Sequence, residues 1–226
     1  MSLERVHIFC DFDGTITVGD TVDFLLEELA DDEWRSIEAE WERGAISSRE
    51  CMTRQIPLIR GGWTGIREAL AKVEVDDSFA SFVAWTKERT IPLTIVSDGL
   101  DLVIHHLLGR SEIEVDKVWS NHLVETQGRL SLRFPERPIK VVCPSGHCKC
   151  QILSACPEGT VRVIIGDGRS DFCWAHRADF VFAKDRLLSY CMDEGIKCIP
   201  FETFADVRFS LEALDTDVRG VEVGAA

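Results

Sequence analysis

Three short apolar runs that end in acidic or small polar residues constrain the fold of this chain more than any other feature. The runs with their polar ends are 6–10 with Asp11-Phe12-Asp13-Gly14-Thr15, 92–96 with Ser97-Asp98-Gly99, and 161–165 with Gly166-Asp167-Gly168-Arg169-Ser170-Asp171. Unbroken apolar runs of this length are typical of strands buried on both faces of a parallel sheet. Since the carboxyl ends of parallel strands share one edge, we expect the three polar turns to face one crevice.

Helical and strand patterns alternate along most of the chain. Residues 16–89 interrupt the alternation with helices only: Asp20 can cap a first helix, Ser47 with Glu50 forms a capping box for another, and Asp76 or Asp77 can cap a helix from residue 79. The elements expected after residue 90 are helices over 101–108, near 149, from 171, over 186–194 and over 203–214, a hairpin over 117–134, and strands at 180–183 and 198–200, with a loose tail after residue 214.

This order predicts an α/β fold with a central parallel sheet and helices on both faces. Residues 16–89 are predicted to be an α-helical cap domain inserted after the first strand. The predicted catalytic core then comprises residues 1–15 and 90–226.

The charge of the chain excludes some classes of partner. Its 226 residues include 25 Lys and Arg against 39 Asp and Glu, a formal charge of −14. Nucleic acids and anionic membranes both require a basic surface, so we expect neither as a partner. No apolar stretch approaches the roughly 18 residues of a membrane helix, and the start of the chain does not resemble a signal peptide. These features predict a cytoplasmic protein.

Nine cysteines at irregular spacing fit free thiols in a reducing compartment. One cluster stands out, formed by Cys143, His147, Cys148, Cys150 and Cys156, and it leaves a zinc site open as an alternative. The cluster lacks the paired Cys-x2-Cys spacing of ordinary structural zinc sites, which disfavours that alternative.

The acids at the strand ends suggest a cation site. Asp11, Asp13 and Asp167 would repel one another in a shared crevice unless a cation held them, and an all-oxygen ligand set suits Mg²⁺. The alternative is that each Asp-Gly pair merely forms a turn or caps a helix. Their occurrence at the ends of successive strands favours the metal site.

The motifs resemble those of a known enzyme family. Asp11-x-Asp13-Gly14-Thr15, Ser97, Lys149 and Asp167-x-x-x-Asp171 occur in the order found in haloacid-dehalogenase-like phosphatases. The helical insertion is similar to that of the phosphoserine-phosphatase-like branch, which has a Rossmann-like core and a small helical cap. The chain looks most like the 2-hydroxy-3-keto-5-methylthiopentenyl-1-phosphate phosphatases of methionine salvage. The segments that carry this likeness are 11–17 with Asp20, Ser47-x-Arg49-Glu50 with Arg54, Asn121-His122, the cysteine-rich stretch before Lys149, and 182–188.

The resemblance implies a role for each motif residue. Asp11 would be the nucleophile that forms an aspartyl-phosphate, and Asp13 the general acid and base. Ser97, Asp98, Gly99 and Lys149 would form the phosphate site. Asp11, the Asp13 backbone carbonyl and Asp167 would bind Mg²⁺, and Asp171 would orient Lys149 or a metal-bound water.

Candidate substrate-pocket residues are Asp20, Trp41, Met52, Gln55 and His122. Gln55 aligns with the arginine that binds the substrate carboxylate in phosphoserine phosphatases, and a neutral amide cannot replace a guanidinium there. Trp41 and Met52 suit a thioether group, but packing between the cap helices is the favoured explanation for them. His122 could polarise a carbonyl or enol oxygen, or serve only the hairpin.

The substrate expected is therefore a small phosphorylated metabolite, and the enzyme a monomer or homodimer. Asp98 adds a negative charge that would suit a cationic substrate, so phosphoethanolamine or phosphocholine is the second candidate. Two other classes stay open: a phosphotransferase or mutase, and a non-catalytic binding protein with the same fold. The second of these should lack one of Asp11, Asp13, Lys149 or Asp167, and all four are present.

Overall fold

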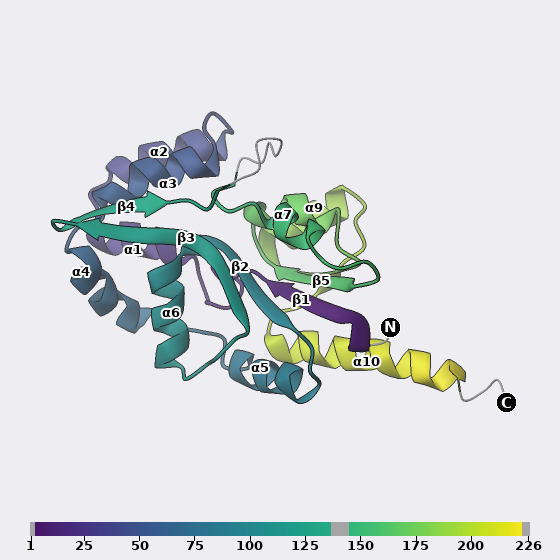
Figure 1. Cartoon of the computed structure of the whole chain (residues 1–226). Coiled ribbons are helices and arrows are strands. Elements are labelled where there is room, and N and C mark those ends of the chain that lie inside the picture. Colours follow the sequence, from purple (N-terminus) through teal and green to yellow (C-terminus); the bar gives the residue numbers. More distant parts are fainter. Residues whose placement is uncertain (1–2, 137–144, 223–226) are drawn as a thin grey trace.

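Seven strands form one sheet in the computed structural model, which describes residues 3–136 and 145–222, with side chains up to residue 215 (Figure 1). The strand order is β4-β3-β2-β1-β5-β6-β7, and every pair of neighbours is parallel except β3 and β4. The strands are β1 (Val6–Cys10), β2 (Leu93–Leu100), β3 (Lys117–Thr126), β4 (Arg129–Arg133), β5 (Val161–Gly166), β6 (Phe180–Ala183) and β7 (Ile199–Pro200). The predicted α/β fold with a central parallel sheet is confirmed.

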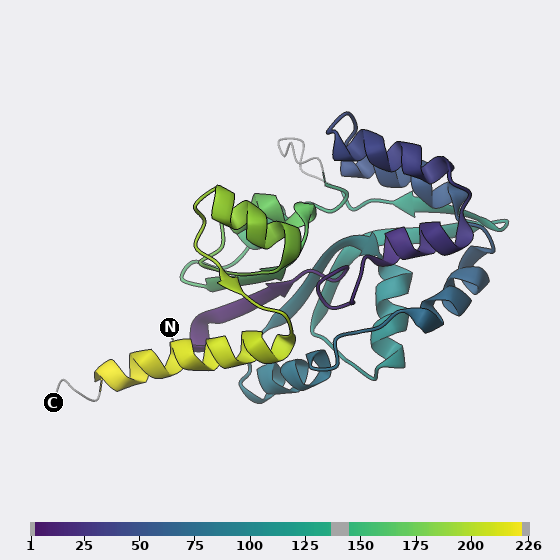
Figure 2. The same cartoon turned by 180° about the vertical axis from the view of Figure 1, so that it is seen from behind.

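Helices cover both faces of the sheet because its central strands are apolar on both sides. Ile8 of β1 packs in one apolar cluster with α5, α6 and α10, whereas Phe9 packs in another with α7, α8 and α9. Figure 2 shows α10 running beside α5 on the first face. These helices are α5 (Phe79–Glu88), α6 (Asp101–Arg110), α7 (Lys149–Ser154), η4 (Arg169–Asp171), α8 (Phe172–Ala175), α9 (Asp185–Asp193) and α10 (Phe204–Glu222).

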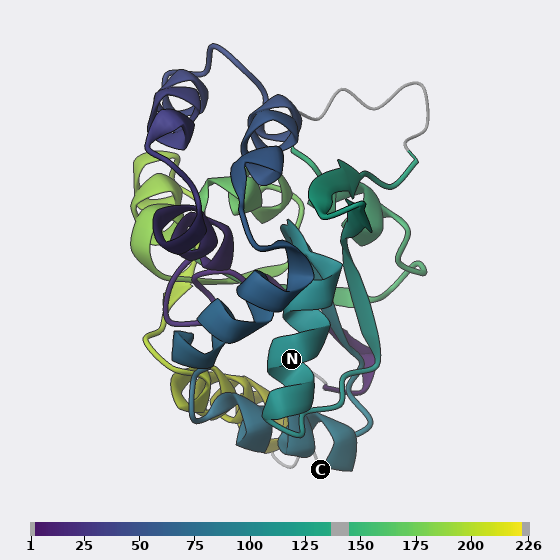
Figure 3. The same cartoon turned by 90° about the vertical axis from the view of Figure 1, so that its left-hand side faces the viewer.

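The segment between β1 and β2 is helical, as its sequence pattern predicts. α2 and α3 lie side by side at one end of the molecule (Figure 3), whereas α5 packs against α10. The remaining short elements of the chain are η1 (Leu3–Arg5), α1 (Thr21–Leu29), α2 (Glu33–Glu42), α3 (Ser48–Gln55), η2 (Ile56–Leu58), α4 (Gly62–Ala69) and η3 (Leu70–Lys72). The division into a cap over 16–89 and a core stays a prediction.

Two of the predicted helix caps are present, and the third is not. The Asp20 carboxylate accepts hydrogen bonds from the Val22 and Asp23 amides (2.8 and 3.0 Å). The Ser47 hydroxyl accepts one from the Glu50 amide (3.1 Å). For α5, however, the residue that precedes the helix is Ser78. Asp76 instead accepts a hydrogen bond from the Ser78 amide (2.7 Å) and so forms the turn before the helix.

The β3–β4 hairpin links the sheet to the inserted helices. Its turn uses Gln127 and Gly128, both at positive φ (52° and 75°), which suits a tight hairpin. From β3, the Glu125 carboxylate accepts a hydrogen bond from the Trp63 amide (3.0 Å) at the start of α4. A carboxylate in that position stabilises a helix N-terminus. The sequence did not predict α4 as a separate helix, because its own Gly62 and Gly65 are poor helix formers. The carboxylate that stabilises its start comes from a distant strand.

Two other elements differ from the sequence-based expectation. β2 does not end at Ser97 but continues to Leu100, and its pairing with β3 is irregular between Val96 and Leu100. Such an irregularity turns side chains toward a site at the sheet edge. α10 extends past the predicted end at residue 214 to Glu222. Among the described residues, no helix has both the length and the apolar character needed to cross a membrane.

Candidate active site

The predicted site lies at the carboxyl ends of β1, β2 and β5. β1 is the strand at which the sheet order reverses, because β2 and β3 lie on one side of it and β5 and β6 on the other. A ligand crevice is expected at such a point. A cavity of about 530 Å³ opens there between the sheet edge and helices α1, α2 and α3. Its lining includes Asp11, Asp13, Asp20, Trp41, Met52, Gln55, Ser97, Asp98, Gly99 and Asp167.

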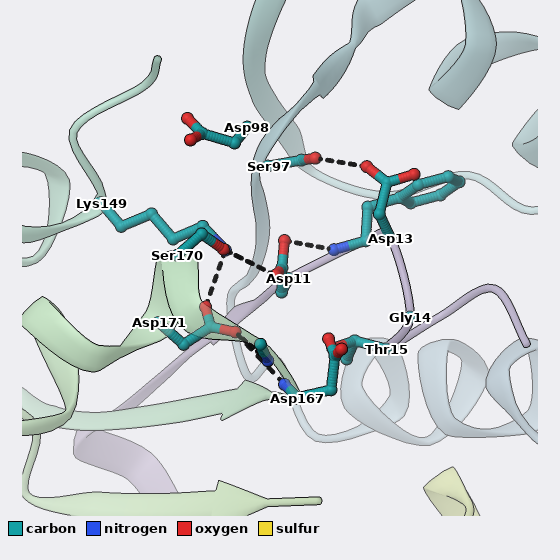
Figure 4. Close-up of polar contacts among 12 residues, drawn as sticks. Asp11, Asp13, Gly14, Thr15, Ser97, Asp98, Lys149, Asp167, Ser170 and Asp171 are labelled. Atoms are coloured by element: carbon teal, nitrogen blue, oxygen red, sulfur yellow. Dashed lines mark hydrogen bonds and ion pairs between the residues drawn. The ribbon is translucent and has the colours of Figure 1, made fainter. Parts of the chain in front are cut away.

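Asp11 is held rigidly at the end of β1 and is 4 % exposed. One carboxylate oxygen, Oδ1, accepts a hydrogen bond from the Phe12 amide (2.7 Å). The other, Oδ2, lies 2.6 Å from the Lys149 Nζ and accepts a longer hydrogen bond from the Ser170 hydroxyl (3.3 Å) (Figure 4). These contacts fix the position of the carboxylate at the edge of the crevice, next to the Lys149 ammonium group.

Lys149 lies wholly buried between two aspartates, at the start of α7. Its Nζ is 2.6 Å from Asp11 Oδ2 and 2.7 Å from Asp171 Oδ1. Burial alone would lower the pKa of Lys149, but attraction to Asp11 and Asp171 outweighs it and raises the pKa above its usual value. The lysine therefore stays charged. Its contact with Asp171 is the one that the predicted orienting role of Asp171 requires, and that role stays a prediction.

Asp13 lies on the opposite side of the crevice from Lys149 (Figure 4). Its Oδ1 accepts hydrogen bonds from the Thr21 amide (3.2 Å) and the Thr21 hydroxyl, and its Oδ2 accepts one from the Ser97 hydroxyl (3.0 Å). Burial raises the pKa of Asp13, the bonds from Thr21 and Ser97 oppose this, and Asp11 adds to it. A raised pKa makes Asp13 a better proton donor near neutral pH.

Asp167 and Asp11 provide the oxygen atoms that a divalent cation requires. One carboxylate oxygen from each of Asp11, Asp167 and Asp171 lies within 4.8 Å of the others. Asp171 is already engaged, because its Oδ1 binds Lys149 and its Oδ2 accepts hydrogen bonds from the Asp167 and Gly168 amides (3.2 and 3.1 Å). Asp167 Oδ1 accepts only a hydroxyl hydrogen bond, from Thr15 (2.5 Å).

This arrangement fits Mg²⁺. Burial, followed by repulsion from Asp11, raises the pKa of Asp167 to about 7. A hard cation between the two carboxylates would relieve that repulsion, and both donors are oxygens. Asp11, Asp167 and Asp171 are the side chains that could hold the ion. The choice of Asp11 and Asp167 among them, and the part played by the Asp13 carbonyl, stay predictions.

Three glycines make room for these aspartates. A Cβ atom at Gly14 would collide with the Asp167 carboxylate, one at Gly99 with Asp13, and one at Gly166 with Asp171. Gly14 also has a φ of +71°, a backbone conformation that disfavours other residues. The amide of Gly99 donates to the Ser97 hydroxyl (2.8 Å), so Ser97 and Gly99 form a connected turn beside Asp13.

Asp98 is directed away from Asp11 and joins three segments (Figure 4). Its carboxylate accepts hydrogen bonds from the Ser48 hydroxyl (2.9 Å), the Gly146 amide (3.0 Å) and the His147 amide. Although it lines the cavity, its oxygens are therefore occupied by the start of α3 and by the turn before α7. A role for this carboxylate in binding a substrate ammonium is correspondingly disfavoured.

The far wall of the cavity carries a carboxylate that the sequence did not single out. Glu38 of α2 accepts a hydrogen bond from the Gln55 side chain at its Oε2 (2.9 Å), and the Cys51 thiol lies 3.7 Å from the same oxygen. Gln55 is 2 % exposed, and its Nε2 also lies 3.4 Å from the Trp34 carbonyl. An α-helical pattern reveals which face Glu38 occupies but not that Gln55 holds it there.

Other predicted residues are placed as follows. Trp41 and Met52 line the cavity, and Asp20 caps α1 at its rim. His122 lies outside the cavity lining; its Nδ1 is 2.9 Å from Asp101 Oδ2, on an exposed part of the hairpin. Thr15, Thr21 and Ser170 also contact the site aspartates. Thr15 ends the first motif and Ser170 lies in the third polar turn, but the sequence predicted no role for either, and Thr21 lies outside the motifs.

The eight cysteines within the described residues are free thiols. Cys143 of the possible zinc cluster lies outside those residues. In the part of the chain that the structure covers, the set of possible metal ligands that comes together is the aspartate group of the crevice.

Comparison with known proteins agrees with this geometry. The family described as haloacid dehalogenase-like hydrolase matches residues 8–176. A 2-hydroxy-3-keto-5-methylthiopentenyl-1-phosphate phosphatase of Geobacillus kaustophilus (strain HTA426) is 34% identical, over 95% of this chain and 99% of the relative. The protein of the same name from Geobacillus thermodenitrificans (strain NG80-2) is 31% identical, over 94% and 98%.

Solved structures show the same fold at low sequence identity. A substrate-bound phosphoserine phosphatase superposes with a TM-score of 0.67 at 17% identity, covering 91% of this chain and 97% of that one. Cytosolic 5'-nucleotidase IIIB bound to cytidine superposes with a TM-score of 0.65 at 18% identity, covering 98% and 88%. Both likenesses show that the overall fold is shared.

Proposed function

Because this chain belongs to the haloacid dehalogenase-like hydrolase family and is a phosphatase, we propose that it hydrolyses a small phosphate monoester through an aspartyl-phosphate on Asp11, with Mg²⁺. The observation that carries this proposal is the position of Asp11, which faces the cavity between the cation Lys149 and the raised-pKa acid Asp13. A nucleophile, a charge-stabilising cation and a proton donor are the groups that such a reaction requires.

In the first step, an Asp11 carboxylate oxygen attacks phosphorus while the bond from phosphorus to the leaving oxygen breaks. Asp13 gives its proton to that oxygen, so the alcohol departs neutral. In the second step, ionised Asp13 takes a proton from water, which attacks phosphorus and releases inorganic phosphate and the Asp11 carboxylate. Lys149 balances negative charge beside Asp11 throughout, and Ser97 holds Asp13 in position by its 3.0 Å hydrogen bond.

Asp11 and Asp167 are the side chains proposed to hold Mg²⁺, together with the Asp13 carbonyl. When bound, the ion supplies positive charge to a crevice otherwise dominated by carboxylates and draws the phosphate toward them. The protein's own contribution is to hold Asp167 in place through Thr15 and through the space left above Gly14.

The apparent affinity for Mg²⁺ is expected to fall as the pH is lowered through 7. The pKa of Asp167 is raised to about 7, so below that pH a proton competes with the ion for this carboxylate. The half-activating concentration of Mg²⁺ should rise by about tenfold per pH unit below 7, as one competing proton requires. Titrating EDTA-treated enzyme with Mg²⁺ at pH 6, 7 and 8 measures this half-activating concentration.

Asp206→Asn provides the control for this titration, since Asp206 lies on α10 with a lowered pKa and should leave the Mg²⁺ curve unchanged. A half-activating concentration that is equal at all three pH values would contradict the assignment of Asp167. Full activity in EDTA would contradict the metal site itself.

The substrate proposed is 2-hydroxy-3-keto-5-methylthiopentenyl-1-phosphate, the compound named in the two relatives described above. Two features of the cavity support it. Trp41, Met52 and Trp34 form an apolar lining that suits a thioether, because sulfur packs favourably against aromatic rings. The leaving group of this compound also carries no carboxylate. This matters because the far wall of the cavity disfavours carboxylate groups.

The far wall repels carboxylates for an electrostatic reason. Glu38 faces the cavity, and the Gln55 amide nitrogen that could have met an anion is bonded to Glu38 instead. Arg186, which also lines the cavity, lies 3.7 Å from Glu42, and Arg169 donates to backbone carbonyls of α2. A like-charge contact in such an enclosure costs several kcal/mol. The same wall would accept an ammonium group, which keeps phosphoethanolamine as the second candidate.

A panel of phosphate esters tests the substrate proposal. Rates on the methylthio-enol phosphate, phosphoethanolamine, phosphocholine, phosphoserine and pyridoxal phosphate should differ, with kcat/KM at least about tenfold higher for the first, which corresponds to 1.4 kcal/mol or more. Values within tenfold across the panel would mean that the enzyme has no dedicated substrate among them. A clear preference for phosphoethanolamine would establish the second candidate.

Glu38→Gln should weaken the discrimination against carboxylates. Phosphoserine and phosphoethanolamine differ only by a carboxylate, so the ratio of their kcat/KM values reports on this wall alone. We expect the wild type to disfavour phosphoserine by at least about tenfold and Glu38→Gln to reduce that ratio toward one. The double variant Glu38→Gln/Gln55→Arg should prefer phosphoserine, because its guanidinium has no internal carboxylate partner at position 38.

Glu40→Gln is the matched control. Glu40 lies on the same helix but pairs outside the cavity with Arg54 (2.7 Å), so its replacement should leave the ratio unchanged. A ratio equally altered by Glu38→Gln and Glu40→Gln would show that general charge, rather than the wall, sets the preference.

The other functional class to separate is a phosphotransferase, which would pass the phosphate from Asp11 to an alcohol. Measuring free phosphate against transferred phosphate in the presence of glycerol decides between them. A cytoplasmic location and a monomeric or homodimeric state are further parts of the proposal.

A further inference from the structure

The α2–α3 pair contacts the core on two sides, through the last residues of α2 and the first residue of α3. α2 ends at Glu42 and α3 begins at Ser48, so residues 43–47 form the tip of this helical pair. On one side, Arg169 of η4 reaches the end of α2. On the other, the Ser48 hydroxyl donates to the Asp98 carboxylate (2.9 Å). The tip therefore bridges the cavity from the turn after β5 to the turn in β2.

Arg169 binds the exposed carbonyl end of α2. Its Nη1 donates to the Trp41 carbonyl (3.1 Å) and to the Glu42 carbonyl (3.2 Å), and its guanidinium lies 5.1 Å from the centre of the Trp41 ring. The last carbonyls of a helix lack amide partners within the helix and attract cations. The Trp41 carbonyl also accepts a hydrogen bond from the Gly44 amide (2.8 Å), so Arg169 is a second donor to it. The last turn of α2 has no basic residue of its own, so a cation from the core supplies this contact.

Arg169 also belongs to the loop that carries the acids of the site. Asp167, whose carboxylate lies beside Asp11, is two residues before it, and Asp171, which holds Lys149, is two residues after it. Within this loop the Asp171 carboxylate accepts hydrogen bonds from the Asp167 and Gly168 amides. Arg169, which contacts the end of α2, thus lies in the same short, internally bonded turn as Asp167 and Asp171.

We propose that Arg169 is a positioning residue, which seats the tip of the α2–α3 pair on the acidic loop and so closes the cavity around the leaving group. This inference rests on the proposed phosphatase function. It adds the residue that connects the inserted helices to the loop that carries Asp167 and Asp171. Because the Arg169 side chain contacts the end of α2 and not Asp11 or Lys149, we expect it to act on substrates whose leaving group extends to α2 and to have little effect on those that do not reach it.

The size of the leaving group provides the test. Arg169→Ala should raise KM for the methylthio-enol phosphate by about tenfold to a hundredfold, the range of a hydrogen bond made by a charged group. For acetyl phosphate, which is too short to reach α2, kcat/KM should change by less than about twofold on the same reasoning. Arg169→Lys, which keeps the charge, should restore part of the lost affinity.

A spectroscopic readout follows the seating of the tip directly. Acrylamide should quench the fluorescence of Trp41 more strongly in Arg169→Ala than in the wild type, with Trp41→Phe in each background identifying the contribution of this residue. Arg89→Ala is the matched control, because Arg89 stacks on Trp85 (4.9 Å) of α5, outside the cavity lining. It should alter neither KM nor the Trp41 quenching.

Ser48→Ala supplies a second variant that removes the other contact of the tip. It should show the same dependence on leaving-group size, and it keeps the proposal open to test if Arg169→Ala fails to fold. An equal loss on acetyl phosphate and the methylthio-enol phosphate would overturn the proposal, as would unchanged KM and quenching in Arg169→Ala. If the wild type hydrolyses neither compound, the proposed function fails, and the quenching measurement alone still decides whether Arg169 holds the end of α2 against the core.

Discussion

Asp11→Asn is expected to lower kcat for p-nitrophenyl phosphate by on the order of 10⁴- to 10⁶-fold, the effect of removing a covalent nucleophile, while the protein stays folded. An amide oxygen cannot form the aspartyl-phosphate, so every substrate should be affected alike. The fold should survive because Lys149 keeps a second anionic partner, Asp171, at 2.7 Å. Steady-state release of phosphate and circular dichroism measure the two expectations.

Asp13→Asn is the control that separates the nucleophile from the proton donor. Loss of general acid catalysis costs about 10²- to 10⁴-fold, and the loss should be largest for alkyl phosphates, whose alkoxide needs a proton to depart. Nitrophenolate leaves readily without one, so p-nitrophenyl phosphate should suffer least. If Asp11→Asn retained activity, or showed this same dependence on the leaving group, the assignment of Asp11 as nucleophile would be wrong.

Lys149→Met should destabilise the protein by about 3–5 kcal/mol, the range for removing one partner of a buried ion pair, and should also lower kcat by on the order of 10²- to 10³-fold. The side chain of Lys149 is fully buried within 2.6 Å of Asp11 and 2.7 Å of Asp171. Without the ammonium, both carboxylates are left buried near each other. Urea unfolding measures the first effect and phosphate release the second.

The destabilisation should also depend on pH in a stated direction. Burial, followed by repulsion from Asp11, raises the pKa of Asp171 well above its usual value, and loss of Lys149 removes a counteracting attraction. A carboxyl group with a raised folded-state pKa binds more protons folded than unfolded, so the stability of Lys149→Met should increase as pH falls from 8 to 5.

Two comparisons sharpen this experiment. Lys72→Met removes an exposed lysine paired with Glu28, and such surface pairs contribute only about 0–1 kcal/mol. The double variant Lys149→Met/Asp171→Asn should recover part of the lost stability, because it removes one of the stranded charges. A loss for Lys149→Met no larger than for Lys72→Met would contradict the central place of this lysine.

The acids of the site were predictable because their positions depend on local order along the chain. Asp11 and Asp167 directly follow buried strands, so the direction of each strand places them at one edge of the sheet. The contacts between elements were not predictable in this way. Nothing in the pattern of α2 shows that Gln55 of α3 would bind Glu38, or that Arg169 would bind the carbonyls of α2.

His122 illustrates the difference between a position that the local sequence predicts and a contact between elements that it does not. It was expected in the substrate pocket, whereas its neighbour Asn121 was not assigned to the pocket, and successive residues of a strand point to opposite faces. Asn121 is the buried one, with its amide nitrogen 3.9 Å from the Met52 sulfur, whereas His122 faces Asp101 on the exposed side. The alternation was readable from the sequence, but which face met the inserted helices was not.

The three glycines of the crevice have a consequence for how variation at this site should be understood. Gly14, Gly99 and Gly166 contribute no functional group, but each occupies the place where a methyl group would displace an aspartate of the site. The site is therefore specified by empty volume as much as by carboxylates. A residue in this crevice can therefore matter for the site without taking any part in the chemistry. A survey restricted to residues with reactive side chains would overlook these three glycines.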